Sequence, residues 1–154
     1  MSVHCEDPGV WRDLELGAPR LAMLAMASRN AARVALLGTS RRDGSPRISP
    51  IEPYLVEGQL LIGAMAWSQK AADLRRDPRY VLHSAITGPD SGEGEFRLAA
   101  AEAWWSSWPS DKAVVLALHI DQAVFVGWDT EQGVMTVDRW SSQDGYSQSH
   151  RTYP

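Results

Sequence analysis

The sequence predicts a mainly β protein of the antiparallel barrel or sandwich class, and three observations support this prediction. About seven short apolar segments have the length and composition of strands, and clusters of turn residues separate them. Apolar residues at helical spacing are found in few places. The chain has 154 residues without an internal repeat or linker, so we expect one domain over residues 1–154.

The first elements are a helix, a short strand and a hairpin turn. Pro19 opens a segment with apolar residues at helical spacing, and proline is tolerated at the first position of a helix because its missing N–H has no partner there. Asn30 is the predicted end of this helix. Residues 34–37 are apolar and predict a buried strand. Asp43-Gly44 then predicts a hairpin, since both residues tolerate positive φ.

The segment from Pro46 to Val56 predicts a second strand with an unusual property. It contains Pro46, Pro50 and Pro53, none of which has an N–H to donate to a neighbouring strand. We therefore expect a bulged strand at the edge of a sheet or facing a ligand.

A turn, a third strand, a short helix and a fourth strand are predicted between residues 57 and 84. Glu57-Gly58 predicts a turn and residues 59–65 a third strand. Residues 70–76 predict a short helix that ends at Asp77-Pro78, because proline cannot continue it. Residues 80–84 predict a fourth strand.

The second half of the chain is predicted in less detail. Residues 95–103 are rich in alanine, which favours a helix, but they begin with a strand-like alternation. Beyond Ser141 the chain is rich in Gly, Ser and Gln, which predicts a mobile tail over 141–154. Three further strands are predicted at 114–120, 123–128 and 134–137.

Composition and charge exclude several classes of function. The net charge of -4 argues against non-specific nucleic-acid binding, which needs a basic surface. No apolar run approaches the ~18 residues of a membrane span, and the first residues do not resemble a signal peptide. The single cysteine, Cys5, can form neither an internal disulfide nor a metal site alone. We expect a cytoplasmic protein.

The residues around Ser68 form a candidate phosphate site. A serine and a lysine at the start of a helix, here Ser68 and Lys70, can hold an anion together with the free backbone N–H groups of the first turn. Arg47 on the second strand could add a planar guanidinium. The alternative is a serine that only caps the helix, beside solvated basic residues. Arg41-Arg42 and Arg75-Arg76 are expected to be solvated, although either pair could contact an acidic cofactor tail.

Other candidate residues carry weaker signals. Trp104, Trp105 and Trp108 either stack on a flat ligand or pack in a core or interface, which is the common role of tryptophan. His83 and His119 lie within predicted strands, and no Cys, His or Glu cluster has the spacing of a metal site. We expect structural roles for both histidines, with His83 as a weak candidate for a substrate pocket.

The order and spacing of these motifs resemble the pyridoxamine 5′-phosphate oxidase-like family, whose fold is the FMN-binding split β-barrel. The order is more specific for the fold than for a reaction. The resemblance covers Leu21 to Ser84 and, more loosely, the strands up to Trp140. It rests on Asp43-Gly44-Ser45-Pro46-Arg47-Ile48-Ser49-Pro50, on Leu61-Ile62-Gly63, and on residues 68–79, which begin Ser68-Gln69-Lys70 and end Asp77-Pro78-Arg79.

The resemblance implies a flavin-dependent oxidoreductase: a homodimer that binds flavin mononucleotide (FMN) in its interface and acts on a small redox substrate. By position, the phosphate would contact Arg47, Ser68 and Lys70, and Gln69 stands where many relatives have a second basic residue. The backbone flanking the ring would come from Ile48, Ser49, Pro50, Gly63, Ala64 and Met65. Three alternatives stay open: the deazaflavin F420 with its acidic tail, a non-enzymatic flavin- or haem-binding protein, and a barrel without a cofactor.

Overall fold

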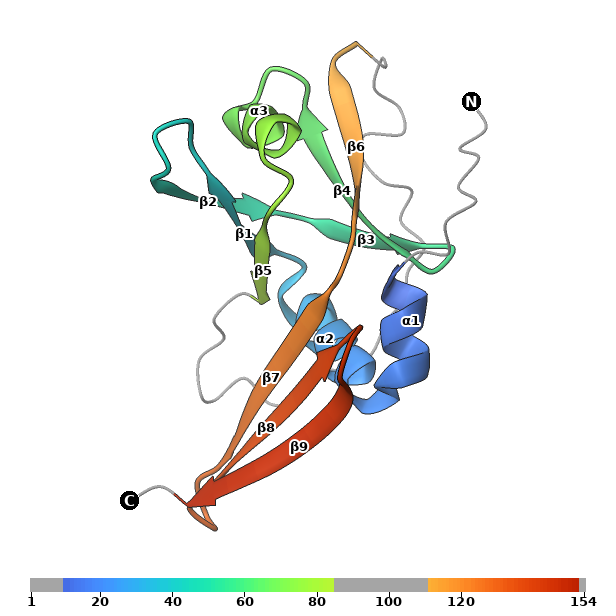
Figure 1. Ribbon diagram of the computed structural model, residues 1–154, viewed down its shortest axis with the longest axis vertical. Coiled ribbons are helices and arrows are strands. Elements are labelled where there is room, and N and C mark those ends of the chain that lie inside the picture. Colours follow the sequence, from blue (N-terminus) through green and yellow to red (C-terminus); the bar gives the residue numbers. More distant parts are fainter. Residues whose placement is uncertain (1–9, 85–110, 153–154) are drawn as a thin grey trace. The chain divides into compact units, whose positions relative to one another are not determined.

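The computed structural model describes residues 10–84 and 111–152 (Figure 1). Cys5, the segment 95–103 and the tryptophans Trp104, Trp105 and Trp108 lie outside the described residues. The chain divides into two compact units. The first contains residues 1–26, 57–59 and 119–154, and the second contains residues 27–56 and 60–118. Whether the chain is a single domain stays a prediction.

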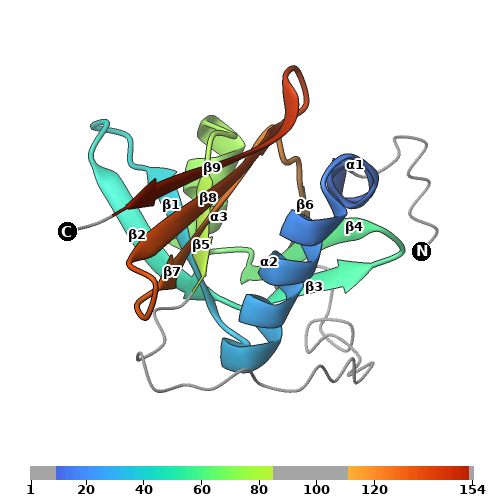
Figure 2. The same ribbon diagram turned by 90° about the horizontal axis from the view of Figure 1, so that it is seen from below.

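Two helices begin the described chain, and the first unit contains α1 and the part of α2 up to Met26. Helix α1 (Val10–Gly17) was not predicted, and α2 (Pro19–Ala32) begins at the predicted proline and continues two residues beyond Asn30. Figure 2 shows α1 nearly end-on and α2 along its length, so the chain turns sharply between them. Trp11, Leu14 and Ala18 recur at helical spacing and are all buried, which explains why this short segment is helical.

The sheet of the first unit is antiparallel, with the strand order β7-β8-β9. Strands β7 (Gln122–Asp129) and β8 (Val134–Ser141) correspond to the last two predicted strands. Val137 and Trp140 of β8 are buried, and Arg20 of α2 pairs with the buried carboxylate of Asp138 at 3.4 Å. The sheet and the helices of this unit therefore share one core.

The polar C-terminal segment forms strand β9 (Gly145–Thr152), where the sequence predicted a mobile tail. Gly145 has a φ of +74°, which allows a tight turn after Ser141. The backbone of β9 then pairs with β8 over its whole length. The prediction was wrong here because ladder hydrogen bonds come from the backbone, and an edge strand with exposed polar side chains needs no apolar composition.

Gly17→Ala is expected to lower the free energy of unfolding by about 1–2 kcal/mol through overpacking. An added Cβ would lie 2.6 Å from the Nε1 atom of Trp140, whose side chain is buried and cannot move aside freely. Urea unfolding followed by tryptophan fluorescence measures the loss. Gly38→Ala is the control, because its Cβ would meet Val81 at an ordinary 3.6 Å. Equal losses in the two variants would contradict the packing at Gly17.

The second unit contains two open antiparallel sheets, with the strand orders β2-β1-β5 and β3-β4-β6 (Figure 1). Their strands are β1 (Ala35–Ser40), β2 (Pro46–Ile51), β3 (Pro53–Val56), β4 (Gln59–Met65), β5 (Val81–Ser84) and β6 (Ala113–Leu118). Within the described residues, every sheet has free edges, as expected of a split barrel rather than a closed one.

The predicted proline-rich strand is divided at Glu52 into β2 and β3. Both parts lie at the edge of their sheets, which confirms the expectation drawn from the three prolines. The turn at Glu57-Gly58 is also confirmed, because both residues have positive φ, of 50° and 77°. Glu57 and Gly58 join β3 to β4, so the chain passes from an edge strand to the centre of the second sheet.

Helix α3 (Gln69–Arg76) lies against β1 in the second unit. It faces the side of the sheet that bears Leu37 and Thr39, both buried. The core of this unit also contains Ile62 and Ala64 of β4 and Ala71 of α3. None of the helices in the described part of the chain is long and apolar enough to cross a bilayer.

Candidate functional site

The start of α3 is built as the sequence predicted. Ser68 has an extended backbone and its hydroxyl accepts a hydrogen bond from the Ala71 backbone N–H at 3.4 Å, so it is the N-cap of the helix. Asp77 ends the helix, and its backbone N–H donates to the Asp73 carbonyl at 2.8 Å. The capping role is therefore present, and it leaves the hydroxyl hydrogen of Ser68 available to a ligand.

Asp73 is the centre of a buried polar cluster that joins α3 to β1 and β2. One oxygen, Oδ2, accepts hydrogen bonds from Arg47 Nε at 2.6 Å and from Thr39 Oγ1 at 3.1 Å. The other, Oδ1, accepts from both terminal nitrogens of Arg76 at 3.4 and 3.3 Å. Arg76 also donates to the Ser40 carbonyl. The cluster fixes the directions of two arginine side chains.

The pKa of Asp73 lies below its ordinary value. The hydrogen bond from Arg47 is the main cause, and those from Thr39 and Arg76 add to it, while burial acts in the opposite direction. The carboxylate is therefore ionised at neutral pH although its side chain is only 4% exposed. An ionised carboxylate that accepts hydrogen bonds from three side chains stabilises the two guanidinium groups among them.

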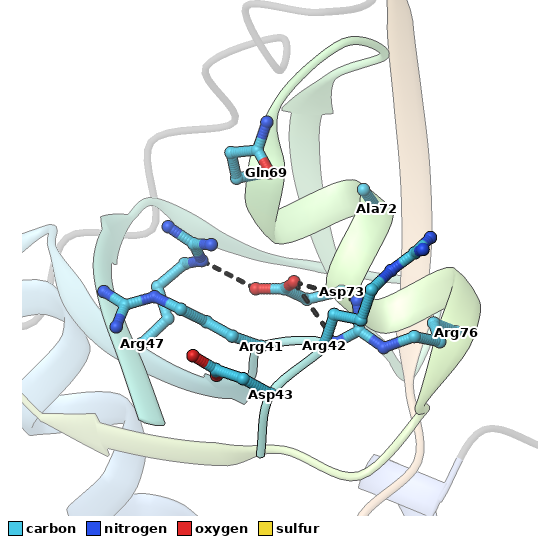
Figure 3. Close-up of a pocket in the computed structure, with 8 residues that line it drawn as sticks. All are labelled: Arg41, Arg42, Asp43, Arg47, Gln69, Ala72, Asp73 and Arg76. Carbon is cyan, nitrogen blue, oxygen red and sulfur yellow. Dashed lines mark hydrogen bonds and ion pairs between the residues drawn. The ribbon is translucent and has the colours of Figure 1, made fainter. Parts of the chain in front are cut away.

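A hollow of about 440 Å³ lies next to this cluster, and arginines are the most frequent residues in its lining. We call it the arginine hollow, and Figure 3 shows its lining side chains around Asp73. Its lining contains four arginines and two aspartates, so positive charges outnumber negative ones by two. The lining residues are Arg41, Arg42, Asp43, Arg47, Gln69, Ala72, Asp73 and Arg76.

A second hollow, of about 230 Å³, lies beside Lys70, and we call it the lysine hollow. The Lys70 ammonium donates to the Pro50 carbonyl at 3.4 Å, a long contact that leaves its charge available. Gly63 of β4, which is half-buried, also lines this hollow. The full lining is Val34, Pro50, Ile51, Glu52, Gly63 and Lys70.

The predicted site residues are thus distributed over two hollows that border α3. Arg47 and Gln69 line the arginine hollow, whereas Pro50, Gly63 and Lys70 line the lysine hollow. Successive side chains of β2 point to opposite faces of the strand, so Arg47 and Pro50 face different hollows. Gln69 and Lys70 are consecutive residues of a helix, so their side chains also point in different directions. The cofactor roles of all these residues stay predictions.

The remaining predicted residues line neither hollow. Ile48 is 72% exposed and lies on the opposite face of β2 from Arg47, while Ser49 shares the face of Arg47. The side chain of Ala64 is buried in the core, so only its backbone could contact a ligand. Met65 is half-buried at the end of β4.

Seven residues of the arginine hollow and its cluster were not among the predicted binding residues. They are Thr39, Arg41, Arg42, Asp43, Ala72, Asp73 and Arg76. The double arginine at the hairpin was visible in the sequence, and it was expected to be solvated, with contact to an acidic cofactor tail as the alternative. Asp73 gave no local signal, because its partners Thr39 and Arg47 lie 34 and 26 residues away.

The histidines do not form a site in the part of the chain that the structure describes. His83 is exposed and its Nδ1 lies 2.6 Å from the Ser84 carbonyl, and His119 pairs with Asp121 at 3.1 Å on the surface. Among residues 10–84 and 111–152, no three His, Cys, Asp or Glu side chains are grouped to hold a metal ion.

Neither a protein-family model nor a curated protein matches this chain, but solved structures do. PhzG from Burkholderia lata, in complex with tetrahydrophenazine-1-carboxylic acid, matches at a TM-score of 0.58 with 11% identity. The match covers 99% of this chain and 100% of PhzG. A pyridoxamine 5′-phosphate oxidase-related, FMN-binding protein from Nostoc punctiforme matches at 0.57 with 15% identity, over 91% of this chain and 100% of that one.

A third similar structure is a heme-binding protein from Mycobacterium smegmatis. It matches at a TM-score of 0.51 with 16% identity over 85% of this chain, which spans 58% of that protein's length. At these identities the matches establish the fold alone. Together with the open antiparallel sheets, they confirm that this chain has the split-barrel fold of the pyridoxamine 5′-phosphate oxidase-like proteins.

Proposed function

We propose that the protein binds FMN and is a flavin-dependent oxidoreductase acting on a small molecule. The observation that carries the proposal is the positively charged arginine hollow together with the Lys70 ammonium of the second hollow, both bordering α3 beside the strands predicted to flank the ring. The FMN-binding protein of the same fold supports it. A phosphate with a charge near −2 needs such cations, and a flat apolar ring needs an open strand surface beside them.

The residues present fit the phosphate end of FMN. Arg47 uses its Nε for Asp73, which leaves both terminal nitrogens to donate to a phosphate. Among the residues that the structure describes, Lys70 contacts only the Pro50 carbonyl, at a long 3.4 Å. A phosphate at the start of α3, where the two hollows border the helix, would be held by charge-assisted hydrogen bonds. Arg47 and Gln69 would donate from the arginine hollow, Lys70 from the lysine hollow, and the Ser68 hydroxyl from the N-cap.

The residues present also fit the ring end. Gly63 and Met65 lie on the face of β4 that points away from the core and is only half-buried. Val115, which pairs with Gly63, is 48% exposed and extends this apolar face onto β6. The backbone of β2 and β4 would orient the ring, and the apolar face would exclude water from one side. Bound FMN would supply the redox chemistry.

A homodimer forms part of this proposal. Several large apolar side chains of the second unit are exposed, among them Ile48 at 72% and Val81 at 67%. Exposed apolar surface of this kind is typical of an interface between subunits. Sedimentation equilibrium is expected to give twice the chain mass of 17.0 kDa. The mass of one chain at micromolar concentration would contradict the dimer.

Haem is a weaker candidate than flavin. The heme-binding protein of the same fold makes it relevant, but neither hollow is lined by a His, Cys, Met or Tyr side chain that could ligate iron. The deazaflavin F420 is the competing cofactor, because it also combines a flat ring with a phosphate. The linings of the two hollows therefore favour a flavin-like ligand.

The absorption spectrum of the purified protein tests the proposal. We expect the visible bands of a flavin, or their appearance after incubation with FMN and gel filtration. Parallel incubation with F420 decides between the two cofactors. A colourless protein that retains neither compound would overturn the proposed redox function.

A further inference from the structure

We propose that Glu52 is a specificity-determining residue whose carboxylate selects a substrate that carries a positive charge. This inference deepens the proposed function, on which it rests, by naming the class of substrate that would approach the flavin ring. Glu52 lines the lysine hollow together with Gly63 and Lys70. Among the described residues of that lining, it is the single acidic side chain.

The first reason is that the Glu52 carboxylate is held in place before any ligand binds. Glu52 lies at the break between β2 and β3, and the residues on either side of it, Ile51 and Pro53, are buried. The phenol of Tyr54 donates to Glu52 Oε2 at 2.9 Å. Fixed neighbours and this hydrogen bond reduce the conformational entropy that binding would otherwise remove. The carboxylate is therefore preorganised to accept a hydrogen bond from a second donor.

The second reason is the charge balance of the lysine hollow. Lys70 and Glu52 line the same hollow but form no ion pair with each other, since Lys70 contacts the Pro50 carbonyl and Glu52 contacts Tyr54. In the proposed function, the Lys70 ammonium binds the phosphate. Glu52 is then the remaining charge of this hollow, and its Oε1 accepts no hydrogen bond from any residue that the structure describes. A cationic group of a substrate would supply both the opposite charge and the donor.

The third reason is the size and position of the lysine hollow. Its volume of about 230 Å³ is below the roughly 300–1,000 Å³ of pockets that enclose a whole ligand, so it fits one part of a molecule. Gly63 lines this hollow and also lies on the half-buried face of β4 that is proposed for the ring. Val34 and Ile51 add apolar surface to the lining. An ammonium group on a short apolar stem would contact this surface and Glu52 at the same time, beside the ring.

Calorimetric titration of the full chain, loaded with FMN where it binds, tests the inference with three probes of similar shape: benzylamine, benzyl alcohol and benzoate. At pH 7 these are a cation, a neutral molecule and an anion. At low salt we expect benzylamine to bind about tenfold more tightly than benzyl alcohol, as one charge-assisted hydrogen bond to an exposed carboxylate would provide. Benzoate should bind most weakly, because Glu52 repels it, and added salt should reduce both differences.

Two matched variants assign the preference to one carboxylate. Glu52→Gln should remove the preference for benzylamine, because the amide has no charge, whereas its oxygen can still accept the hydrogen bond from Tyr54 and so preserve the local structure. Glu131→Gln is the control, since Glu131 is exposed and lines neither hollow. It should keep the full preference for benzylamine.

Two results would overturn the inference. One is that benzylamine binds no more tightly than benzyl alcohol, which includes the absence of measurable binding by both, and the other is that Glu52→Gln and Glu131→Gln have the same effect. Titration with FMN on the same samples separates this inference from the proposed function. Binding of FMN without a preference for benzylamine rejects only the role of Glu52, whereas a preference for benzylamine that depends on Glu52, in a protein that does not bind FMN, rejects only FMN as the cofactor.

Discussion

The Asp73→Asn variant is expected to lose about 2–4 kcal/mol of its free energy of unfolding. Asp73 is buried and accepts hydrogen bonds from Thr39, Arg47 and Arg76. An amide of the same size has only one acceptor oxygen and no charge, and its NH2 group would face a donor. Two guanidinium groups would then lack their anionic partner.

Urea unfolding at pH 7 measures this loss, and Asp111→Asn, at an exposed position, is the control. The pH dependence supplies a second readout. Because the pKa of Asp73 is lowered in the folded state, its contribution is complete above the ordinary aspartate pKa of about 4 and is lost as the pH falls below it. The difference between the wild type and Asp73→Asn should therefore shrink in acid. A difference that is small at pH 7 or independent of pH would contradict this role.

Lys70→Ala is expected to weaken FMN binding by about tenfold to a hundredfold. A charge-assisted hydrogen bond contributes about 1.5–3 kcal/mol, which corresponds to that range of affinity. Within residues 10–84 and 111–152, the ammonium has a single hydrogen bond, the 3.4 Å contact with the Pro50 carbonyl, so its removal should leave stability nearly unchanged. Fluorescence titration of FMN measures the affinity.

The chain contains only one other lysine, which makes the control unambiguous. Lys112 is exposed and lines neither hollow, so Lys112→Ala should bind FMN as the wild type does. Lys70→Arg should retain most of the affinity because it keeps the positive charge. An unchanged affinity in Lys70→Ala would contradict a contact between Lys70 and the phosphate, and Arg47→Ala would then test the arginine hollow alone.

Local signals were sufficient to predict much of the fold. Proline cannot donate to a sheet, so Pro46, Pro50 and Pro53 correctly predicted edge strands. Ser68 and Pro78 likewise marked the limits of α3, since one caps a helix and the other cannot continue it.

Features that depend on distant partners were not predictable from the sequence. Helix α1 is stabilised by burying Trp11 and Leu14, and β9 by pairing with β8, and neither depends on a strong local motif. The division of the site into two hollows has the same origin. It depends on the hydrogen bond between Asp73 and Arg47, which are 26 residues apart in the sequence, and on the face of β2 to which each side chain points.

Parallel fluorescence titrations of the wild-type protein with FMN and with riboflavin test the central claim most directly. The two compounds share the ring, and only FMN carries the phosphate that Arg47 and Lys70 would bind. We predict saturable binding of one FMN per chain and an affinity for riboflavin at least about tenfold lower, as expected for the loss of charge-assisted hydrogen bonds. Equal affinities, or no saturable binding of FMN, would contradict a phosphorylated flavin at this site.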